Sequence, residues 1–368
     1  MDYRKFDYDR VRALSERVFE WYQFSKEEAE TITDVLLTSN LYGIESHGVQ
    51  RLTLYPYGID IGRIKVEAKA EIVQETPVSA LIDAHECMGQ LSGTMAMKLA
   101  IEKAQKTGIG MTLVKNSNHY GIAGYYSMMA AREGLLGISM TNTEALVVPT
   151  FGKRPIMGTN PIAVTMPADP VYFHMDMSTS VVTAGKMEVY AKNDKALPAG
   201  WSVGQDGSDN CDAREFLNIR KNKTNGGLLP LGGYGEMFGG HKGYGFSMLV
   251  ELMTGILSGG FTSTLVRKDK SVERCCHMFM AIDYGMFGDK KEIEKHFSDF
   301  LQEIRDSEKA VGCDRIYIHG EKEAESVARV REEGIAMNQA TIDEITKLCQ
   351  RCDIPVEEYL VEKCIKNS

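Results

Sequence analysis

Two histidines and one arginine are the side chains of this sequence best suited to proton transfer beside a carboxylic acid. The first histidine and the arginine lie in the segment Glu45-Ser46-His47-Gly48-Val49-Gln50-Arg51. If this segment is helical, His47 and Arg51 are four residues apart and lie on one face. An imidazole exchanges a proton near neutral pH, and a guanidinium grips a carboxylate with two hydrogen bonds. The alternative is that these residues have no chemical role, with the serine as a helix N-cap and the histidine and arginine on the surface.

The second histidine, His119, lies in Asn116-Ser117-Asn118-His119-Tyr120-Gly121, where a predicted strand gives way to a predicted helix. Backbone N–H groups at a helix start bind phosphate or carboxylate, and Gly121 and Gly124 allow a flat ring to approach closely. The segment therefore predicts a ligand loop, and the alternative is a tight turn with a hydrogen-bonded histidine.

Three further segments offer polar groups for a ligand. Gly158-Thr159-Asn160-Pro161 is typical of a turn, and Thr159 and Asn160 could face a ligand from it. Asp176-Met177-Ser178 follows a β-type run and could face a ribose or a phosphate. Gly240-His241-Lys242-Gly243 precedes an apolar helix, so Lys242 is a candidate phosphate ligand, or else an exposed lysine in a flexible connection.

Several common signatures are absent from the sequence. It contains no G-x-G-x-x-G and no P-loop, so an ordinary dinucleotide fold and a P-loop NTPase are disfavoured. No H-x-x-x-H or H-E-x-x-H spacing occurs, and we expect no metal. The eight cysteines, including Cys349 and Cys352 of a C-x-x-C, are expected to be reduced thiols in a cytoplasmic protein.

The composition limits the partners. The net charge of −9, from 42 basic and 51 acidic residues, argues against nucleic acid as the main partner. No apolar run reaches the length of about 18 residues that a membrane span requires, and the polar start lacks a signal peptide, so we expect no membrane association. The 368 residues are enough for two or three lobes.

Hydrophobic periodicity predicts helices near both ends and strand–helix alternation between them. The expected helices cover 8–22, 26–43, 46–58, 90–106, 123–133, 243–257, 324–333, 339–350 and 356–366. The expected strands cover 70–74, 78–84, 110–115 and 136–141. The apolar helix 243–257 should be buried, and residues 202–226 should form a polar surface excursion with few apolar anchors. The helices at the two ends should pack together.

Taken in order, these segments resemble the type-2 malate/L-lactate dehydrogenase family. The matching segments are Gly43-Ile44-Glu45-Ser46-His47-Gly48 with Arg51, Asn118-His119-Tyr120-Gly121, Gly158-Thr159-Asn160-Pro161, Asp176-Met177-Ser178-Thr179-Ser180 with Gly185-Lys186, Leu229-Pro230-Leu231-Gly232-Gly233, His241-Lys242-Gly243-Tyr244-Gly245, His319-Gly320-Glu321 and Glu333-Gly334-Ile335. His319 stands where the family often has proline, and 202–226 looks diverged.

The resemblance implies an α/β (α+β) fold with a non-Rossmann cofactor domain, a mainly antiparallel sheet and a helical domain formed from both termini. The helical domain would comprise 1–72 with 315–368, and the cofactor- and substrate-binding domain 73–314. The resemblance also implies a homodimer that uses NAD or NADP. The cofactor contacts would be Tyr120, Gly121, Thr143, Asp176, Met177, Ser178, His241, Lys242, Gly243 and Gly320. The substrate contacts would be Arg51, Thr159, Asn160 and Lys186.

The resemblance further implies hydride transfer to or from C2 of a small 2-hydroxy or 2-keto acid. We expect His47 as the acid/base, steered by Ser46, and His119 as the group that polarises the substrate oxygen; the reverse assignment stays open. Malate and oxaloacetate are the favoured pair. Alternatives are a lactate, ureidoglycolate, sulfolactate or diketogulonate dehydrogenase, a cyclic imine reductase, or a dinucleotide-binding protein without catalysis.

Overall fold

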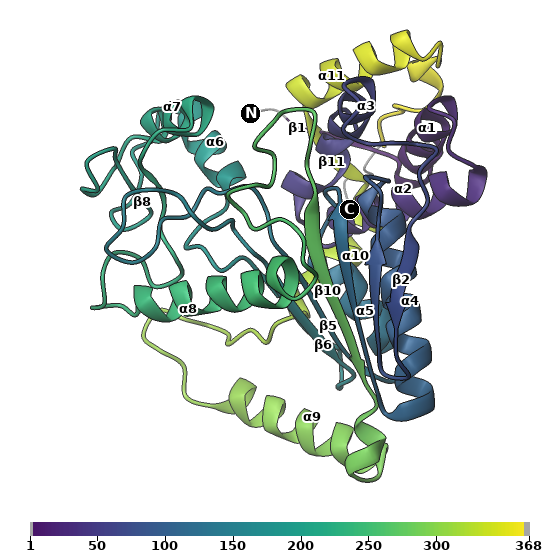
Figure 1. The fold of residues 1–368 in the computed structure, drawn as a ribbon, viewed down its shortest axis with the longest axis vertical. Helices are drawn as coiled ribbons and strands as arrows, with labels where there is room; N and C mark the ends of the chain where they lie inside the picture. The colour runs from purple at the N-terminus through teal and green to yellow at the C-terminus, as the bar shows by residue number, and fades with distance from the viewer. Residues whose placement is uncertain (1–2, 364–368) are drawn as a thin grey trace.

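A seven-stranded sheet forms the centre of the computed structural model, which describes residues 3–363 (Figure 1). In spatial order its strands are β2 (Glu71–Glu75), β3 (Ser79–Asp83), β4 (Ile109–Ser117), β10 (Cys275–Ile282), β5 (Leu136–Thr141), β6 (Ile162–Met166) and β7 (Phe173–Met177). Every neighbouring pair is antiparallel except β3 with β4. The prediction of a mainly antiparallel, non-Rossmann sheet is therefore confirmed.

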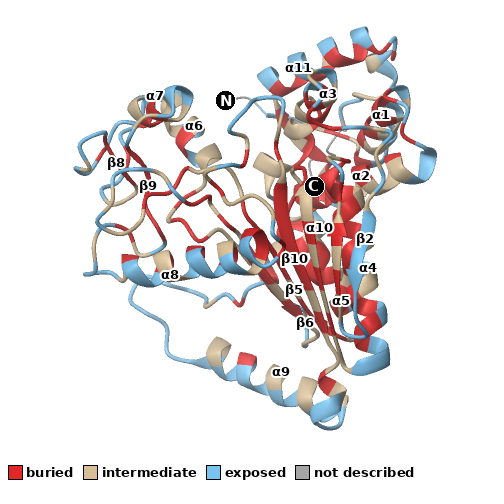
Figure 2. Ribbon diagram, viewed as in Figure 1, coloured by how far each residue is buried: buried red, intermediate tan, exposed pale blue. Residues whose placement is uncertain are grey.

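Two helices, α4 (Gly89–Thr107) and α5 (Ala123–Arg132), pack against the sheet through one hydrophobic cluster (Figure 2). Gly110 in β4 permits close approach of α4, because a Cβ there would lie 2.0 Å from the carbonyl oxygen of Ala100. The helices and strands predicted between residues 90 and 141 are confirmed, with ends shifted by at most two residues.

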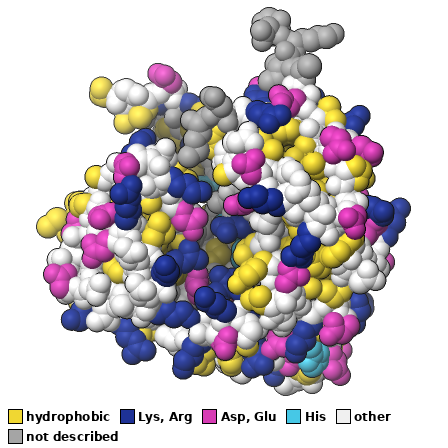
Figure 3. Space-filling view, turned by 90° about the horizontal axis from the view of Figure 1, so that it is seen from above, with side chains coloured by type: hydrophobic (Ala, Val, Ile, Leu, Met, Phe, Trp, Pro, Cys, Tyr) yellow, Lys and Arg dark blue, Asp and Glu magenta, His cyan; other side chains and the backbone are white. Residues whose placement is uncertain are grey.

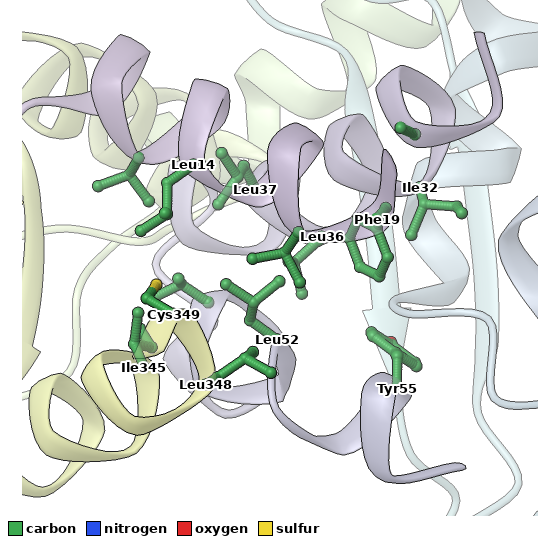
Figure 4. Packing of buried hydrophobic residues seen from close by; sticks show 14 of the residues in the cluster. Leu14, Phe19, Ile32, Leu36, Leu37, Leu52, Tyr55, Ile345, Leu348 and Cys349 are labelled. Atoms are coloured by element: carbon green, nitrogen blue, oxygen red, sulfur yellow. The ribbon is translucent and has the colours of Figure 1, made fainter. Parts of the chain in front are cut away.

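Elements from both ends of the chain form a second packed unit (Figure 4). They are β1 (Tyr3–Phe6), α1 (Tyr8–Trp21), α2 (Lys26–Leu41), α3 (Leu54–Asp60), α10 (Glu321–Glu333), β11 (Ile335–Asn338) and α11 (Gln339–Arg351). β1 pairs with β11, and Leu14 and Leu36 share a hydrophobic cluster with Ile345 and Leu348. The predicted packing between the two termini is confirmed, while the domain boundaries stay a prediction.

The predicted helix from residue 46 to 58 is wrong. Two separate 3-10 turns, Glu45–His47 and Val49–Arg51, precede α3. Gly48 separates the turns and packs against Asn40, because a Cβ at residue 48 would lie 2.2 Å from Asn40 Oδ1. That oxygen also accepts the Val49 N–H at 2.7 Å, which removes this donor from a regular helical pattern.

The prediction that helix 243–257 is buried is also wrong. Residues Gly240–Glu251 form α8, and a π-helical turn continues it over Leu252–Ile256. Its apolar side chains are exposed in the single chain, including Phe246 at 44%, Leu252 at 47% and Ile256 at 55% (Figure 2). The helix is thus apolar on a face that no other described segment covers.

Residues 202–226 are not the bare surface excursion that their polar composition suggests. They contain β8 (Ser202–Val203) and α7 (Ala213–Asn222), and β8 pairs with β9 (Gly227–Leu228). Phe216 of α7 is buried in a small cluster with Val147 and with Met187 of α6 (Ala184–Lys192). A few well-placed apolar residues therefore give this part of the chain its own core.

Several further elements were not predicted, among them β1, β6 and the central strand β10. Helix α9 (Lys290–Asp306) was not predicted. The helix expected at 356–366 is instead the 3-10 turn Val356–Glu358, and the end of that range lies outside the described residues. Seven cysteines are free thiols, and Cys364 lies outside the described residues. Among the helices of residues 3–363, none combines the length and the hydrophobicity needed to cross a bilayer.

Candidate active site

One cavity of about 250 Å³ brings the two histidines and the arginine together. His47 and Arg51 come from the two 3-10 turns, and His119 comes from the loop between β4 and α5. The lining also includes other residues predicted for the site: Ser46, Tyr120, Gly121, Thr143, Thr159, Asp176, Met177 and Ser178. Seen from above, the molecule is hollowed between its two sides, with lysine and arginine side chains around the hollow (Figure 3).

The two imidazole rings lie nearly parallel, with centroids 5.6 Å apart and planes inclined by 25°. Each ring has a hydroxyl group at its Nδ1 atom. Ser46 Oγ lies 3.0 Å from His47 Nδ1, and the Tyr55 hydroxyl of α3 lies 3.0 Å from His119 Nδ1. Both rings are therefore held at one nitrogen, and Nε2 is the nitrogen left for a ligand.

The contacts of His119 favour one tautomer. The Gly121 N–H, which can only donate, points at His119 Nδ1 over 3.4 Å. Nδ1 is then the acceptor, so the neutral ring carries its proton on Nε2. In this tautomer the Tyr55 hydroxyl donates to Nδ1 as well. His119 thus offers an N–H donor to an oxygen atom in the cavity.

Both imidazoles are neutral at pH 7. Burial, and next the positive charge of Arg51, lower the pKa of His47 to about 4. Burial also lowers the pKa of His119 well below its ordinary value, and repulsion from His47 when that ring is protonated, and from Arg51 and Arg267, adds to the effect. A neutral His47 has an unprotonated ring nitrogen in the resting protein, so it can accept a proton from a ligand.

Arg51 is available to bind an anion. Its Nε donates to the backbone oxygen of Ser46 at 2.6 Å, which fixes the side chain beside the histidines. Among the ion pairs of residues 3–363, none involves Arg51. A guanidinium that faces a cavity without a carboxylate partner is suited to a carboxylate ligand.

The wall formed by the end of β7 suits a nicotinamide riboside. Asp176 Oδ2 accepts the Gly124 N–H at 2.7 Å, and burial raises the pKa of this carboxyl to about 6. The hydroxyl groups of Thr143, Thr159 and Ser178 line the same cavity. Its apolar lining consists of side chains such as Leu54, Ile122, Leu146 and Pro161. Flat apolar surface for a ring and hydroxyl or carboxylate groups for a ribose are thus both present.

The structure places the other predicted ligand residues outside this cavity. The Asn160 side-chain nitrogen donates to Glu251 at 2.9 Å, and the Asn160 side-chain oxygen accepts the Thr143 N–H at 3.2 Å. Asn160 therefore stabilises the segment between β5 and β6. Lys186 lies over the Trp201 ring at 5.2 Å and lines a larger adjoining cleft. His241, Lys242 and Gly243 begin α8, and Gly320 packs against the Tyr172 carbonyl oxygen.

The start of α8 nevertheless adjoins the cavity through backbone contacts. The Leu231 N–H donates to the Thr179 carbonyl oxygen at 2.8 Å, one residue beyond Ser178. Gly243 packs directly on Leu231, where a Cβ would lie 2.0 Å from the Leu231 oxygen. In the described part of the chain, no three His, Cys, Asp or Glu side chains gather in a metal-binding arrangement.

Reading the sequence missed several residues that line the cavity or contact its histidines. Tyr55 is one, although it lies only four residues after Arg51. Arg220 and Arg267 also line the cavity. Arg220 lies in the segment expected to be a surface excursion, and no local motif marks either arginine. Only the tertiary fold identifies them.

We predict that Tyr55→Phe lowers kcat roughly fivefold to tenfold, because one buried hydrogen bond of about 1 kcal/mol to His119 is lost. The KM for the substrate should change little, since Arg51 is untouched. Steady-state kinetics with Tyr57→Phe as the control measures this effect, because Tyr57 is on the same helix but 49% exposed. Equal kcat values for the two variants would show that the Tyr55 hydroxyl does not position His119.

The buried histidines also predict acid sensitivity of the fold. Burial lowers the pKa of His277 to about 3 and that of His174 to about 4, with Arg132 contributing at His174. The unfolded chain binds these protons at about pH 6.5, so stability is lost as pH falls below that value. The raised pKa of Asp176 acts in the opposite direction and offsets part of the loss.

We therefore expect the free energy of unfolding to fall by at least about 3 kcal/mol from pH 7 to pH 4.5, at about 1.4 kcal/mol per pH unit for each affected histidine. Urea unfolding at several pH values measures this slope. His277→Gln should reduce the slope, and His85→Gln, at an exposed site, should not. A stability that is constant over this range would contradict the prediction.

Comparison with known proteins identifies the family to which the chain belongs. The malate/L-lactate dehydrogenase family matches residues 6–346. A malate dehydrogenase of Pyrococcus abyssi is 43% identical over 354 residues, which cover 96% of each chain. A malate/(S)-sulfolactate dehydrogenase of Methanothermus fervidus is 35% identical and covers 94% of this chain and 97% of its own length.

A solved structure leads to the same family. The crystal structure of malate dehydrogenase from Entamoeba histolytica has a TM-score of 0.93 at 35% identity, and the match covers 96% of this chain and 99% of that one. The resemblance seen in the motifs is therefore confirmed along nearly the whole sequence, and the chain belongs to the malate/L-lactate dehydrogenase family of oxidoreductases.

Proposed function

We propose that the enzyme transfers a hydride between the nicotinamide of NAD or NADP and C2 of a 2-hydroxy or 2-keto carboxylic acid. The observation that carries this proposal is the pair of neutral imidazoles beside an arginine without a carboxylate partner, all in one cavity. The nicotinamide, when bound, supplies the hydride acceptor or donor. Asp176, Thr143, Thr159 and Ser178 would hold it, and the cofactor would extend towards Lys242 and Gly320.

The side chains support a simple division of labour. Arg51 binds the substrate carboxylate and so fixes C2 in the cavity. During oxidation His47 accepts the proton of the C2 hydroxyl group, which its low pKa allows at neutral pH. His119 donates its Nε2–H to the same oxygen and stabilises the charge that develops on it. Ser46 holds the His47 ring in place through Nδ1.

Malate and oxaloacetate are the substrates we favour, because the relatives with 43% identity are named malate dehydrogenases. Sulfolactate is the next candidate, supported by the 35% identical relative that is named for both acids. Ureidoglycolate and diketogulonate are weaker, since the relatives named for them are 28% identical. Lactate and a cyclic imine complete the alternatives.

A direct assay tests this function. The purified chain is given NADH or NADPH with oxaloacetate, 3-sulfopyruvate, pyruvate and 2-oxobutanoate, and the absorbance at the reduced nicotinamide band is followed. We expect turnover with at least one cofactor, fastest with oxaloacetate. Binding of NADH without turnover of any keto acid would instead support the non-catalytic dinucleotide-binding alternative.

We also infer that the enzyme is a homodimer in which a second copy covers α8. The exposed apolar side chains of this helix and its π-helical extension support the inference, since apolar surface of this extent marks an interface. The expected mass by light scattering is twice 41.0 kDa. A monomer at micromolar concentration would contradict it. The cytoplasmic location and the two-domain division remain predictions from the sequence.

A further inference from the structure

The catalytic cavity contains two more guanidinium groups besides that of Arg51. Arg220 reaches it from α7, and Arg267 reaches it from the segment that precedes β10. Neither residue is needed for the division of labour described above, in which Arg51 binds the C1 carboxylate. Two guanidinium groups beyond Arg51 indicate that the cavity can bind a second negatively charged group.

Arg267 is held rigidly. Its Nε and Nη2 atoms form a two-pronged contact with Glu273, at 3.1 and 2.7 Å from Oε2. Glu273 is buried and also lies 3.5 Å from Arg63, so its negative charge is shared between two arginines. After burial, His47 and Arg51, the positive charge of Arg267 is a further cause that lowers the pKa of His119. The Nη1 end of Arg267 is the end not used by Glu273.

Arg220 lies beside it. Its Nη2 donates to Glu144 Oε1 at 2.6 Å, and its Nη1 donates to Glu188 at 3.0 Å. The same Glu144 oxygen lies 3.6 Å from Arg267 Nη1, so one carboxylate stands between the two guanidinium groups. A guanidinium has five N–H donors, and these contacts leave donors on both arginines for a further acceptor.

The surroundings of this pair are basic. Arg220 and Arg267 also line a second cavity of about 220 Å³ on their other side. That cavity contains Arg154, Lys223 and Lys268, and Glu144 is its only acidic lining residue among residues 3–363. Lys223 donates to the carbonyl oxygens of Arg267 and Lys268, at 3.0 and 2.9 Å, which hold its ammonium group beside the pair. The excess of basic side chains in this second cavity therefore adds positive potential at the pair.

We propose that Arg220 and Arg267 bind a second acidic group of the substrate, at the end of the molecule opposite to the carboxylate held by Arg51. The enzyme then selects 2-hydroxy and 2-keto acids that carry a carboxylate or a sulfonate one or two carbons beyond C2. An acid that ends in a methyl or another uncharged group cannot accept a charge-assisted hydrogen bond from these guanidinium groups, so it binds more weakly. This inference rests on the proposed hydride transfer, and it names the chemical class of the substrate.

The test compares substrates within one variant. Arg220→Gln is assayed with oxaloacetate, with 3-sulfopyruvate and with 2-oxobutanoate, which has four carbons but no second acidic group. We expect kcat/KM for the two doubly charged acids to fall at least tenfold further than kcat/KM for 2-oxobutanoate, about the effect of one charge-assisted hydrogen bond. The ratio within one preparation is independent of how much of the variant is folded.

A matched control is available on the same helix. Arg214 of α7 pairs with exposed Asp194 away from both cavities, so Arg214→Gln should leave the substrate ratio of the wild type unchanged. An unchanged ratio in Arg220→Gln, with the wild type active, would overturn this inference alone. A loss for oxaloacetate but not for 3-sulfopyruvate would restrict the site to carboxylates. A wild type that reduces no keto acid would overturn the proposed function and this inference with it.

Discussion

Replacing His119 or His47 with asparagine is expected to lower kcat by roughly 10²- to 10⁴-fold, the usual contribution of a positioned acid/base group. The two rings lie 5.6 Å apart and each is fixed at Nδ1, so neither can take over from the other without losing its own contact. His85→Asn is the control, since that ring is exposed and pairs with Glu71. Near-full turnover in either cavity variant would contradict its assigned role.

The pH dependence separates the two roles. For oxidation, kcat/KM of the wild type should stay constant from pH 7 to about pH 5 and fall only as the pKa of His47, about 4, is approached. His47→Asn should abolish this acid limb, because the group that titrates is gone. His119→Asn should retain the acid limb of the pH profile, with a much lower kcat/KM at every pH. The opposite pattern would make His119 the proton acceptor.

Arg51→Gln is expected to reduce kcat/KM by about 10²- to 10³-fold, mainly through KM, because a two-pronged, charge-assisted contact with the substrate carboxylate is lost. Arg51→Lys should recover only part of the loss, since an ammonium group cannot form the same fork. Removal of this charge should also raise the pKa of His47, since Arg51 is one of the two causes that lower it. Arg17→Gln, at the exposed surface of α1, serves as the control.

Two outcomes would contradict this role of Arg51. One is a variant with unchanged KM and kcat. The other is an acid limb of the pH profile that does not move to higher pH, which would place Arg51 too far from His47 for the charge to matter. The two readouts are independent, because one reports substrate binding and the other reports electrostatics in the free enzyme.

The local parts of the fold were predictable from the sequence. The strand–helix alternation between residues 90 and 141 follows from hydrophobic periodicity, and a capping box formed by Ser25 and Glu28 begins the helix predicted from residue 26. The residue types around His47 and His119 also pointed to the chemistry. Their proximity did not follow from spacing, because 72 positions separate them and only the packing of the terminal helices against the β4–α5 loop joins them.

The failures have physical causes of the same kind. Gly48 interrupts the helix expected after residue 46 because its neighbour Asn40 fills the space a side chain would need. Helix α8 is apolar yet exposed in the single chain, and periodicity cannot distinguish a buried apolar helix from an exposed one. Arg220 was predicted to lie on the surface because the segment around it is mostly polar. The small core around Phe216, which holds α7 in place, depends on a few apolar residues that the polar composition does not reveal.

The most direct test of the account is to follow the transferred atom. The wild-type enzyme reduces oxaloacetate with NADH or NADPH that carries deuterium at the reactive C4 position, and the acid product is examined by NMR. Direct hydride transfer predicts one deuterium on C2 of malate. Malate without deuterium at C2, or no malate with either cofactor, would contradict hydride transfer in the cavity of His47, His119 and Arg51.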